Sequence, residues 1–413
     1  MKQILIVFLI MPFINSAQTK YYNYNLYEGK SYLFIMDQSN DVMLNSIRFI
    51  GGQINNPQNT KKEEKLYGTG LLIFTSLIGQ AITHEAGHQS VLSELGIGSI
   101  SKPFIDKNLV AKVTGVTNET LVNLRNNSFP SYIRLHTAGL ESDYAYLRKS
   151  DRYFSFNEED YKVLYPDYVI RKLATQFYYL TSFYDSKTKI KEADSNELDR
   201  DIVGHDIYGM IRHLHRPSME FYRYTQRGGL TTEEKLYARR IGYMSLVNFL
   251  NPNLWKSRNY KLSDIVTGNF SVSYSLAPFG DFIEQNAYLK ISDKYKLNPY
   301  FRQYFNKSYT FLAGGIGLYN YSFLKDKFLL NSSLDFWEQP RNLEFRTKVK
   351  EVGFGVKSEL AMRFSKGKSD TKPSAYFNLG MSYKTNGFIP EAPSLCNDFQ
   401  IYLGVIVSVK NKS

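Results

Sequence analysis

Five consecutive residues, His84-Glu85-Ala86-Gly87-His88, are the clearest candidates for chemistry in the sequence. Side chains four residues apart share one face of an α-helix, so His84 and His88 can direct their imidazoles to one metal ion. Glu85 would then lie beside the open coordination position of a Zn²⁺ ion, where its carboxylate can accept a proton from water. The pattern predicts a zinc site with Glu85 as the general base. It also requires a third ligand from elsewhere in the chain.

This H-E-x-x-H pattern resembles that of the zincins, a group of zinc metallopeptidases, over the helical half of the chain. The resemblance implies that His84 and His88 are zinc ligands, that Glu85 is the catalytic base and that the target is a peptide bond. In gluzincin-like members a glutamate on a later helix supplies the third ligand. Glu141 is the leading candidate for that ligand here.

The segment 198–206 offers other third ligands, namely Asp201, His205 and Asp206. The order of these segments is similar to that in intramembrane zincins of the site-2 type. In those proteins an apolar helix with the motif is followed by a later segment that contributes an aspartate ligand. His136 is a candidate donor to the oxyanion of the reaction, and packing in a core is the alternative interpretation of this residue. The sequence leaves the third ligand open between Glu141 and this later segment.

Residues 18–262 are predicted to be mainly helical, and these helices must position the motif. Candidate helices cover 132–148, 168–184, 199–215 and 233–251, whereas 117–130 and 185–197 are predicted loops. The stretch 66–83, directly before the motif, has no charged residue. Its glycines, threonines, Ser76 and Gln80 favour a buried core helix, and a membrane segment is the alternative.

From residue 263 onward, the apolar residues alternate with polar or small ones. Val352, Phe354 and Val356 alternate with Gly353, Gly355 and Lys357, and further strands are predicted near 269–279, 282–292, 298–306, 309–323, 326–338, 342–349, 375–384 and 399–409. Strands of about ten residues with one apolar and one polar face are typical of a transmembrane β-barrel. The pattern resembles small outer-membrane barrels of Gram-negative bacteria, with a soluble antiparallel sheet as the alternative.

The N-terminus and the composition limit the location and the partners of the chain. Lys2, an apolar run over 4–14 and the small residue Ala17 predict a secretory signal peptide over 1–17. The single cysteine, Cys396, excludes a disulfide framework and a multi-cysteine zinc site. The net charge of +12 suits anionic surfaces, but Lys and Arg are scattered, so no nucleic-acid partner is expected.

The sequence therefore predicts an α+β protein with a signal peptide (1–17), a mainly helical zincin-like domain (18–262) and a C-terminal antiparallel β-barrel of about eight strands (263–413). The predicted function is that of an exported, zinc-dependent metallopeptidase-like hydrolase in the outer membrane or periplasm of a Gram-negative bacterium. Its expected substrates are peptides or proteins at the envelope. Two alternatives stay open: a non-enzymatic outer-membrane protein with a helical plug or binding module, and a zinc hydrolase acting on envelope lipid or glycan.

Overall fold

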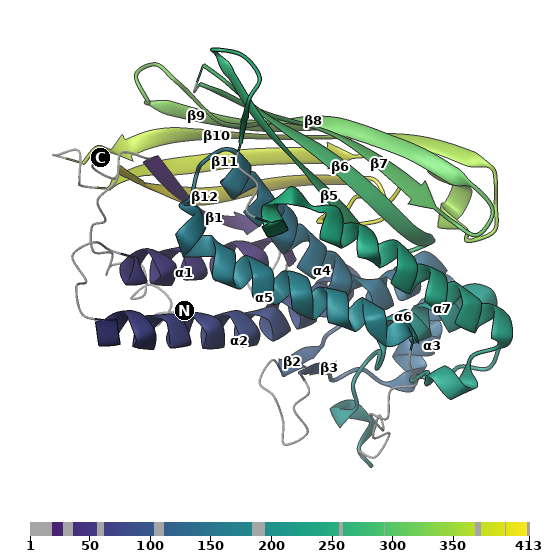
Figure 1. Ribbon diagram of the computed structural model, residues 1–413. Helices are drawn as coiled ribbons and strands as arrows, with labels where there is room; N and C mark the ends of the chain where they lie inside the picture. The colour runs from purple at the N-terminus through teal and green to yellow at the C-terminus, as the bar shows by residue number, and fades with distance from the viewer. Residues whose placement is uncertain are drawn as a thin grey trace.

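The computed structural model describes residues 19–27, 36–55, 62–102, 111–183, 195–255, 259–292, 294–367, 373–392 and 394–410. The predicted signal peptide, 1–17, lies outside the described residues, as does most of the predicted loop 185–197. Helices lie against one face of a large antiparallel sheet, which forms the other layer (Figure 1).

The helices are α1 (Met36–Ile54), α2 (Lys62–Glu94), α3 (Asn118–Asn127), α4 (Phe129–Ser155), α5 (Tyr161–Leu180), α6 (Asp206–His215) and α7 (Thr232–Ser245), followed by the short 3-10 helices η5 (Leu246–Leu250) and η6 (Pro252–Trp255). The large sheet contains β1 (Thr19–Tyr27), β4 (Tyr260–Lys261), β5 (Val266–Ala277), β6 (Gly280–Ile291), β7 (Tyr295–Phe305), β8 (Thr310–Phe323), β9 (Phe328–Pro340), β10 (Lys350–Ser365), β11 (Ser374–Lys384) and β12 (Asp398–Lys410). A separate small ribbon pairs β2 (Ile100–Lys102) with β3 (Lys112–Thr114).

The large sheet is open rather than closed. Within the described residues its ten strands run in the order β1-β12-β11-β10-β9-β8-β7-β6-β5-β4. The predicted closed barrel of about eight strands is therefore wrong, because β1 and the short β4 form two separate edges. Helical elements pack beside both ends of the sheet, α1 against β1 and η5 with η6 against β5. The predicted strand 342–349 is also wrong, since Arg341–Leu343 is a 3-10 turn.

The alternation along the strands is confirmed. On β10 the side chains of Val352, Phe354 and Leu360 are exposed on the outer face, whereas Gly353 and Glu359 lie on the inner face. Antiparallel partners continue these faces, because a period of two keeps paired residues on the same side of the sheet. The outer face of the sheet is consequently apolar and exposed, and the inner face is largely polar.

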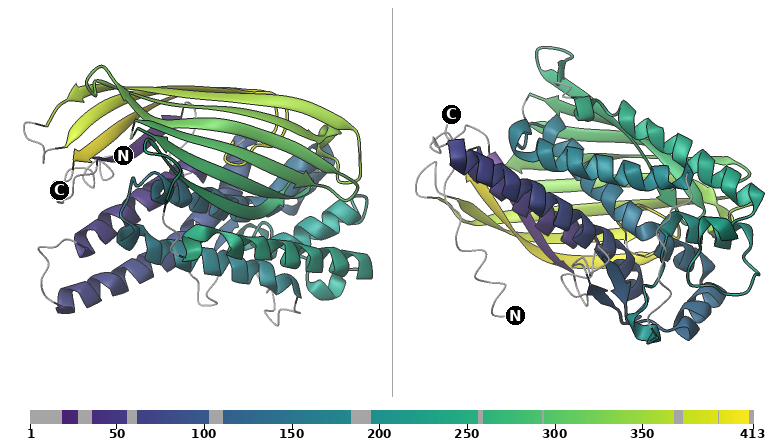
Figure 2. Two further views of the ribbon diagram at one scale, coloured as in Figure 1. Left: turned by 45° about the horizontal axis from the view of Figure 1, so that its top comes forward. Right: turned by 60° about the horizontal axis from the view of Figure 1, so that its bottom comes forward.

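Helix α4 runs through the centre of the molecule, between the sheet and the other helices (Figure 2). It is longer than the predicted 132–148 and is buried along most of its length. The predicted loop 117–130 is wrong, because α3 occupies most of it. The Thr117 side chain accepts a hydrogen bond from the backbone N–H of Thr120 and so caps the start of α3.

The apolar stretch 66–83 forms about half of α2, from its fifth residue onward, but it is not the buried core helix that the sequence favours. Leu66, Tyr67 and Phe74 are exposed, whereas Ser76 and Thr83 are among the buried residues. Among the described helices, α2 over Glu63–Glu94 is the one long and apolar enough to cross a membrane, by length and composition.

The helical and strand-rich halves share their cores. One cluster joins Leu140 of α4 to Tyr274 and Leu276 of β5, and another joins Tyr144 of α4 to Phe282 of β6. β1, which precedes all of the described helices, completes the end of the sheet next to the C-terminal strand, with Thr19 opposite Lys410. The two halves separated at residue 262 in the sequence therefore pack as layers around common cores.

Candidate metal centre

Three helices bring the motif together with its neighbours. His84 and His88 lie one turn apart on the last third of α2, where α4 crosses closely. The close approach depends on two glycines. A Cβ atom at Gly139 would lie 2.3 Å from His84 Nε2, and one at Gly87 would lie 2.1 Å from the carbonyl oxygen of Ala138. Glycine at both positions therefore lets α4 pass directly over the imidazole rings.

Each histidine is held through its Nδ1 atom. His84 Nδ1 lies 3.0 Å from Asp143 Oδ2, and His88 Nδ1 donates to the Leu135 carbonyl oxygen at 2.7 Å. Both acceptors come from α4. A histidine that donates its Nδ1–H to a carboxylate or carbonyl keeps its Nε2 lone pair available for a metal. The arrangement thus fixes both rings in the orientation that zinc ligation requires.

Asp206, the first residue of α6, faces the two free Nε2 atoms. Its carboxylate oxygens lie 3.3 Å from His84 Nε2 and 3.5 Å from His88 Nε2, and one ligand atom from each residue falls within 4.8 Å of the others. Two ligands of a tetrahedral zinc ion with bonds of 2.0–2.1 Å are about 3.3 Å apart. The donor types and the two histidine–aspartate distances therefore fit Zn²⁺.

The electrostatics around Asp206 favour its ionised form. Burial opposes ionisation, but His88 and His84 together hold the pKa of Asp206 below its usual range. Its backbone N–H donates to the Tyr178 hydroxyl at 3.0 Å, which orients the start of α6. A metal site needs this carboxylate ionised and both imidazoles neutral, so a bound zinc ion would displace the proton whose charge on the histidines now stabilises Asp206.

Asp201 lies close to the site, but its carboxylate binds the backbone of the loop that precedes α6. Its carboxylate accepts a hydrogen bond from the backbone N–H of Gly204 at 3.1 Å. Burial, and then the charge of Asp206, raise the pKa of Asp201 to about 7. Glu85 is buried and close enough to His84, Asp201 and Asp206 to interact with their charges, and its role as the base stays a prediction.

Glu141, the leading sequence candidate for the third ligand, is not brought to the histidines, and Asp206 lies beside them instead. Its carboxylate forms a two-pronged ion pair with Arg134, at 3.0 Å to Nε and 2.6 Å to an Nη atom. It also accepts a hydrogen bond from the backbone N–H of Glu391 at 3.0 Å. Because Glu141 follows Gly139 by two residues, it points to a different side of α4.

The remaining sequence candidates have other surroundings. The Nε2 atom of His205 lies 3.0 Å from the Thr181 hydroxyl, and its ring stacks on Tyr208 at 3.8 Å. His136 is completely buried against the Tyr132 ring, with a centroid separation of 5.1 Å. A sealed position does not suit the oxyanion donor that the sequence suggested for His136, and core packing describes it better.

The sequence did not predict two neighbours of the histidines. Asp143 binds His84 through its Nδ1 atom, and Tyr178 packs beside the His84 ring. The ring of Tyr178 lies 5.8 Å from that of His84. Only the position of Asp143, four residues after Gly139 and thus on the same face of α4, offered a signal in the sequence.

Comparison of the chain with known protein families, with curated proteins and with solved structures found no match.

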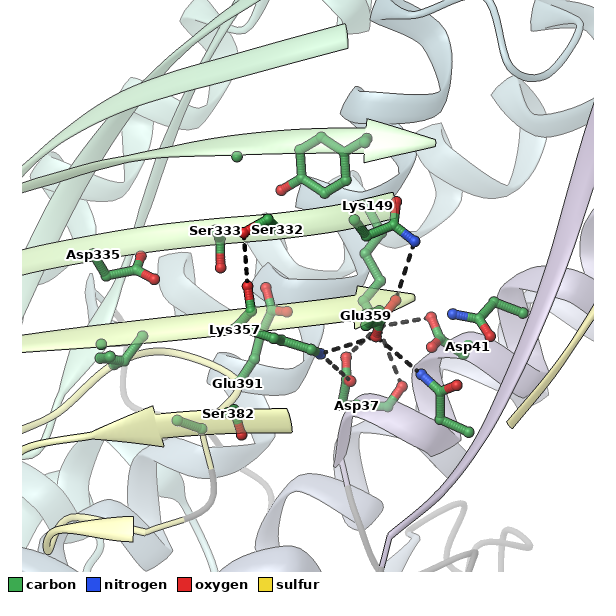
Figure 3. Close-up of a pocket in the computed structure, with 18 of the residues that line it drawn as sticks. Asp37, Asp41, Lys149, Ser332, Ser333, Asp335, Lys357, Glu359, Ser382 and Glu391 are labelled. Atoms are coloured by element: carbon green, nitrogen blue, oxygen red, sulfur yellow. Dashed lines mark hydrogen bonds and ion pairs between the residues drawn. The ribbon is translucent and has the colours of Figure 1, made fainter. Parts of the chain in front are cut away.

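A second polar region lies between the inner face of the sheet and helices α1 and α4 (Figure 3). It is a cavity of about 250 Å³ lined mainly by tyrosines, asparagines and charged residues. Its charges are largely paired with one another. Lys149 binds both Asp37 and Asp41, with 2.7 Å to Asp41, while Lys357 lies 3.8 Å from Asp37 and 3.7 Å from Glu359. This cavity is lined by residues other than those of the metal centre.

Proposed function

We propose that the protein is a zinc-dependent hydrolase of the metallopeptidase type, with His84, His88 and Asp206 as the zinc ligands. The observation that carries the proposal is the meeting of two anchored Nε2 atoms with an ionised carboxylate at tetrahedral spacing. Ligands from separate helices, α2 and α6, converge on this point. A hydrogen-bonded His–Asp cluster without metal function would not need both histidines to direct the same atom to one place.

Glu85 and Asp143 have different roles in the proposed reaction. A zinc ion bound here supplies a Lewis acid for the substrate carbonyl and lowers the pKa of bound water toward about 7. Glu85, next to His84 in the chain, takes the proton from the attacking water on its carboxylate and returns it to the leaving amine. Asp143 holds the orientation of His84 throughout, because its carboxylate accepts the Nδ1–H.

The protein is proposed to be exported to the cell envelope, in the outer membrane or periplasm. Its proposed substrates are peptides or proteins at the envelope. Support comes from the predicted signal peptide and from the exposed apolar outer face of the sheet, where Phe354, Leu379 and Leu403 lie on three neighbouring strands. A face of this kind is unusual in a water-soluble protein.

Metal analysis of the purified chain tests the ligand set. We expect about one zinc per chain in the native protein, and its loss in Asp206→Ala and in the double variant His84→Ala/His88→Ala. Asp201→Asn is the matched control, because it removes a nearby, partly buried carboxylate but should keep the metal. A native protein without zinc, or an Asp206→Ala variant that binds zinc as well as the native chain, contradicts the proposed centre.

The role of Glu85 is tested separately from binding. Glu85→Gln keeps the size of the side chain but cannot accept the proton, so zinc content should be unchanged while hydrolysis falls by about 10²–10⁴-fold. Activity is measured on mixed peptide libraries and on ester substrates, which also distinguishes a peptidase from a hydrolase of envelope lipid. Unchanged turnover in the zinc-loaded Glu85→Gln variant would exclude Glu85 as the base.

A further inference from the structure

The helices beside the open sheet have an inverted arrangement of polar and apolar side chains. On α5 the charged residues Asp167, Arg171 and Lys172 are buried, whereas Phe177 is exposed. The partly exposed positions of α5 between its ends are also apolar, namely Tyr165, Pro166, Val169, Ile170, Leu173, Ala174, Tyr178 and Leu180. A helix in a water-soluble protein shows the opposite pattern.

The buried charges of α5 are satisfied inside the molecule. Arg171 donates to Asp167 at 3.0 Å and to the Thr83 hydroxyl of α2 at 2.9 Å, and its guanidinium lies 3.7 Å from the centroid of the Tyr146 ring. Asp167 also accepts from the Tyr146 hydroxyl at 2.7 Å. The polar groups of this helix therefore serve the interior and leave the outer side apolar.

The same inversion continues on the neighbouring helices. Leu71, Phe74 and Leu77 of α2 point outward, while η5 and η6 expose Leu250 and Trp255. The buried residues of η5 and η6 include polar ones, Asn248 and Asn253. We define the helical apolar band as the exposed apolar residues of these elements: Leu66, Tyr67, Leu71, Ile73, Phe74, Leu77, Phe177, Leu246, Leu250 and Trp255.

These helices also occupy the gap between the two edges of the sheet. From one edge, β1 contacts α1, α1 contacts α2, and α2 contacts α5. From the other edge, β5 contacts η5 and η6, and η5 contacts α5. Figure 2 shows α1, α2 and α5 beside the central helix α4. Strands and helices thus form one continuous wall around a polar interior that includes the cavity of Figure 3.

The dimensions and charges of the band match a lipid bilayer. The uncharged stretch 66–83 is about 27 Å long at 1.5 Å per residue, against a hydrocarbon core of about 30 Å. Charged residues mark its outer end, where Glu63, Glu64 and Lys65 are exposed at the start of α2 and Lys162 is exposed at the start of α5. These two helix starts lie at the same end of the molecule, because Gly68 approaches Ile54 and Gly51 approaches Val163.

We propose that the helical apolar band and the outer face of the sheet are both covered by membrane lipid, so that α2 and α5 complete a mixed wall of strands and helices within the bilayer. The helical half is then part of the membrane body rather than a domain attached to it. His84 directly follows the uncharged stretch, so the metal centre lies at one boundary of the bilayer. This inference rests on the surface of the molecule and does not depend on zinc or on hydrolysis.

Tryptophan quenching by brominated phosphatidylcholine tests the proposal on the full chain in vesicles. Trp255→Phe removes the exposed tryptophan and leaves Trp337, which is buried and provides the baseline. In that background Phe74→Trp places a reporter in the middle of the band, and Leu198→Trp places one at an exposed apolar site outside it. With bromines deep in the acyl chains, we expect the reporter at position 74 to lose most of its fluorescence and the reporter at 198 to keep its intensity.

A third reporter, Phe377→Trp on the outer face of β11, separates the outcomes. If it is quenched while the reporter at 74 is quenched no more than the one at 198, lipid covers the sheet alone and the proposal is overturned. If neither is quenched and light scattering shows a dimer, a second copy of the chain covers these faces, which also overturns it. Zinc content is measured on the same samples, so failure here is distinguishable from failure of the metal centre.

Discussion

At the residue scale, the proposed metal centre depends on glycines as well as on its donor atoms. His84 and His88 can meet Asp206 only because α4 carries no side chain where it passes over the rings, at Gly139. The anchors of both histidines, Asp143 and the Leu135 carbonyl, lie on the same helix. A small shift of α4 therefore moves the crossing point and both anchors together, which makes the geometry sensitive to single atoms at this contact.

We therefore expect Gly139→Ala to weaken zinc binding. Its Cβ atom would lie 2.3 Å from His84 Nε2 and 2.6 Å from His88 Nε2, so the rings or the helix must move. Loss of ring orientation should reduce the affinity by about 10–100-fold, the size seen when such outer contacts are removed. A zinc titration against a competing chelator measures the change.

Gly70→Ala is the matched control for that variant. It is also a glycine within a helix, but nothing lies within 4 Å of the added Cβ atom. Zinc affinity should be unchanged, and stability should rise slightly because alanine favours the helix. Equal zinc affinities in the two variants would show that the contact at Gly139 does not set the ligand geometry.

The sequence could predict only the local part of this site. His84, Glu85 and His88 are linked by helical spacing, which is a local property. Asp206 reaches them through the packing of α6, and no fixed spacing encodes that distance. The residue type of Glu141 fits zinc, but Arg134, seven residues earlier on the same helix, binds its carboxylate. The ion pair between Arg134 and Glu141 within α4 therefore keeps the Glu141 carboxylate away from the histidines.

At the element scale, α4 and α6 meet through buried histidines. His213 of α6 lies in contact with Tyr132 and His136 of α4, and its Nε2 atom is 3.1 Å from the Tyr132 hydroxyl. Burial, and then His136 and Arg125, lower the pKa of His213 to about 2. This histidine is therefore neutral in the folded protein at every pH near neutrality.

The fold should consequently lose stability in mild acid through His213. A histidine with a lowered folded pKa is protonated first in the unfolded chain, so folding stability falls as the pH drops below the unfolded value of about 6.5. Between about pH 7.5 and pH 5.5 the loss from this residue should be about 1.4 kcal/mol.

Denaturant unfolding of the native chain and of His213→Gln at both pH values measures this contribution. The variant should be less stable at neutral pH, but its loss on acidification should be smaller by the stated amount. His205→Gln is a second variant on the same segment, and burial lowers the pKa of His205 to about 4, so the same direction applies there. Identical pH dependence in the native chain and His213→Gln would exclude a buried neutral histidine at this contact.

The elements also show which parts of a fold can be predicted from sequence. The strands of the second half were predictable because alternation is local, and β10 follows it with Val352 and Phe354 outward. Closure was not predictable, since it depends on which elements cover the sheet edges. The burial of the stretch 66–83 is wrongly predicted for a related reason. Polar residues such as Ser76 favour a buried helix, but Ser76 packs inward while Leu71 and Phe74 are exposed on the other side.

At the scale of the whole molecule, the ends of the described chain lie together in the sheet, with β1 beside β12. Arg48 of α1 connects this edge of the sheet to the helical layer. It is completely buried, donates to Glu159 at 3.0 Å and to the Tyr21 carbonyl oxygen at 2.8 Å, and lies 4.1 Å from the Tyr153 ring centroid. One side chain thus joins β1, α1 and the end of α4.

We expect Arg48→Met to destabilise the whole protein by about 3–5 kcal/mol, because Glu159 is also completely buried and would lose one of its two cationic partners. The double variant Arg48→Met/Glu159→Gln should lose less than the sum of the two single losses, because each single variant already removes the contact between Arg48 and Glu159. Unfolding in denaturant measures both, and Ser46→Ala on an exposed position of α1 is the control. A single variant as stable as that control, or a double variant whose loss is the sum of the two single losses, would show that Arg48 does not connect the helical layer to the sheet edge.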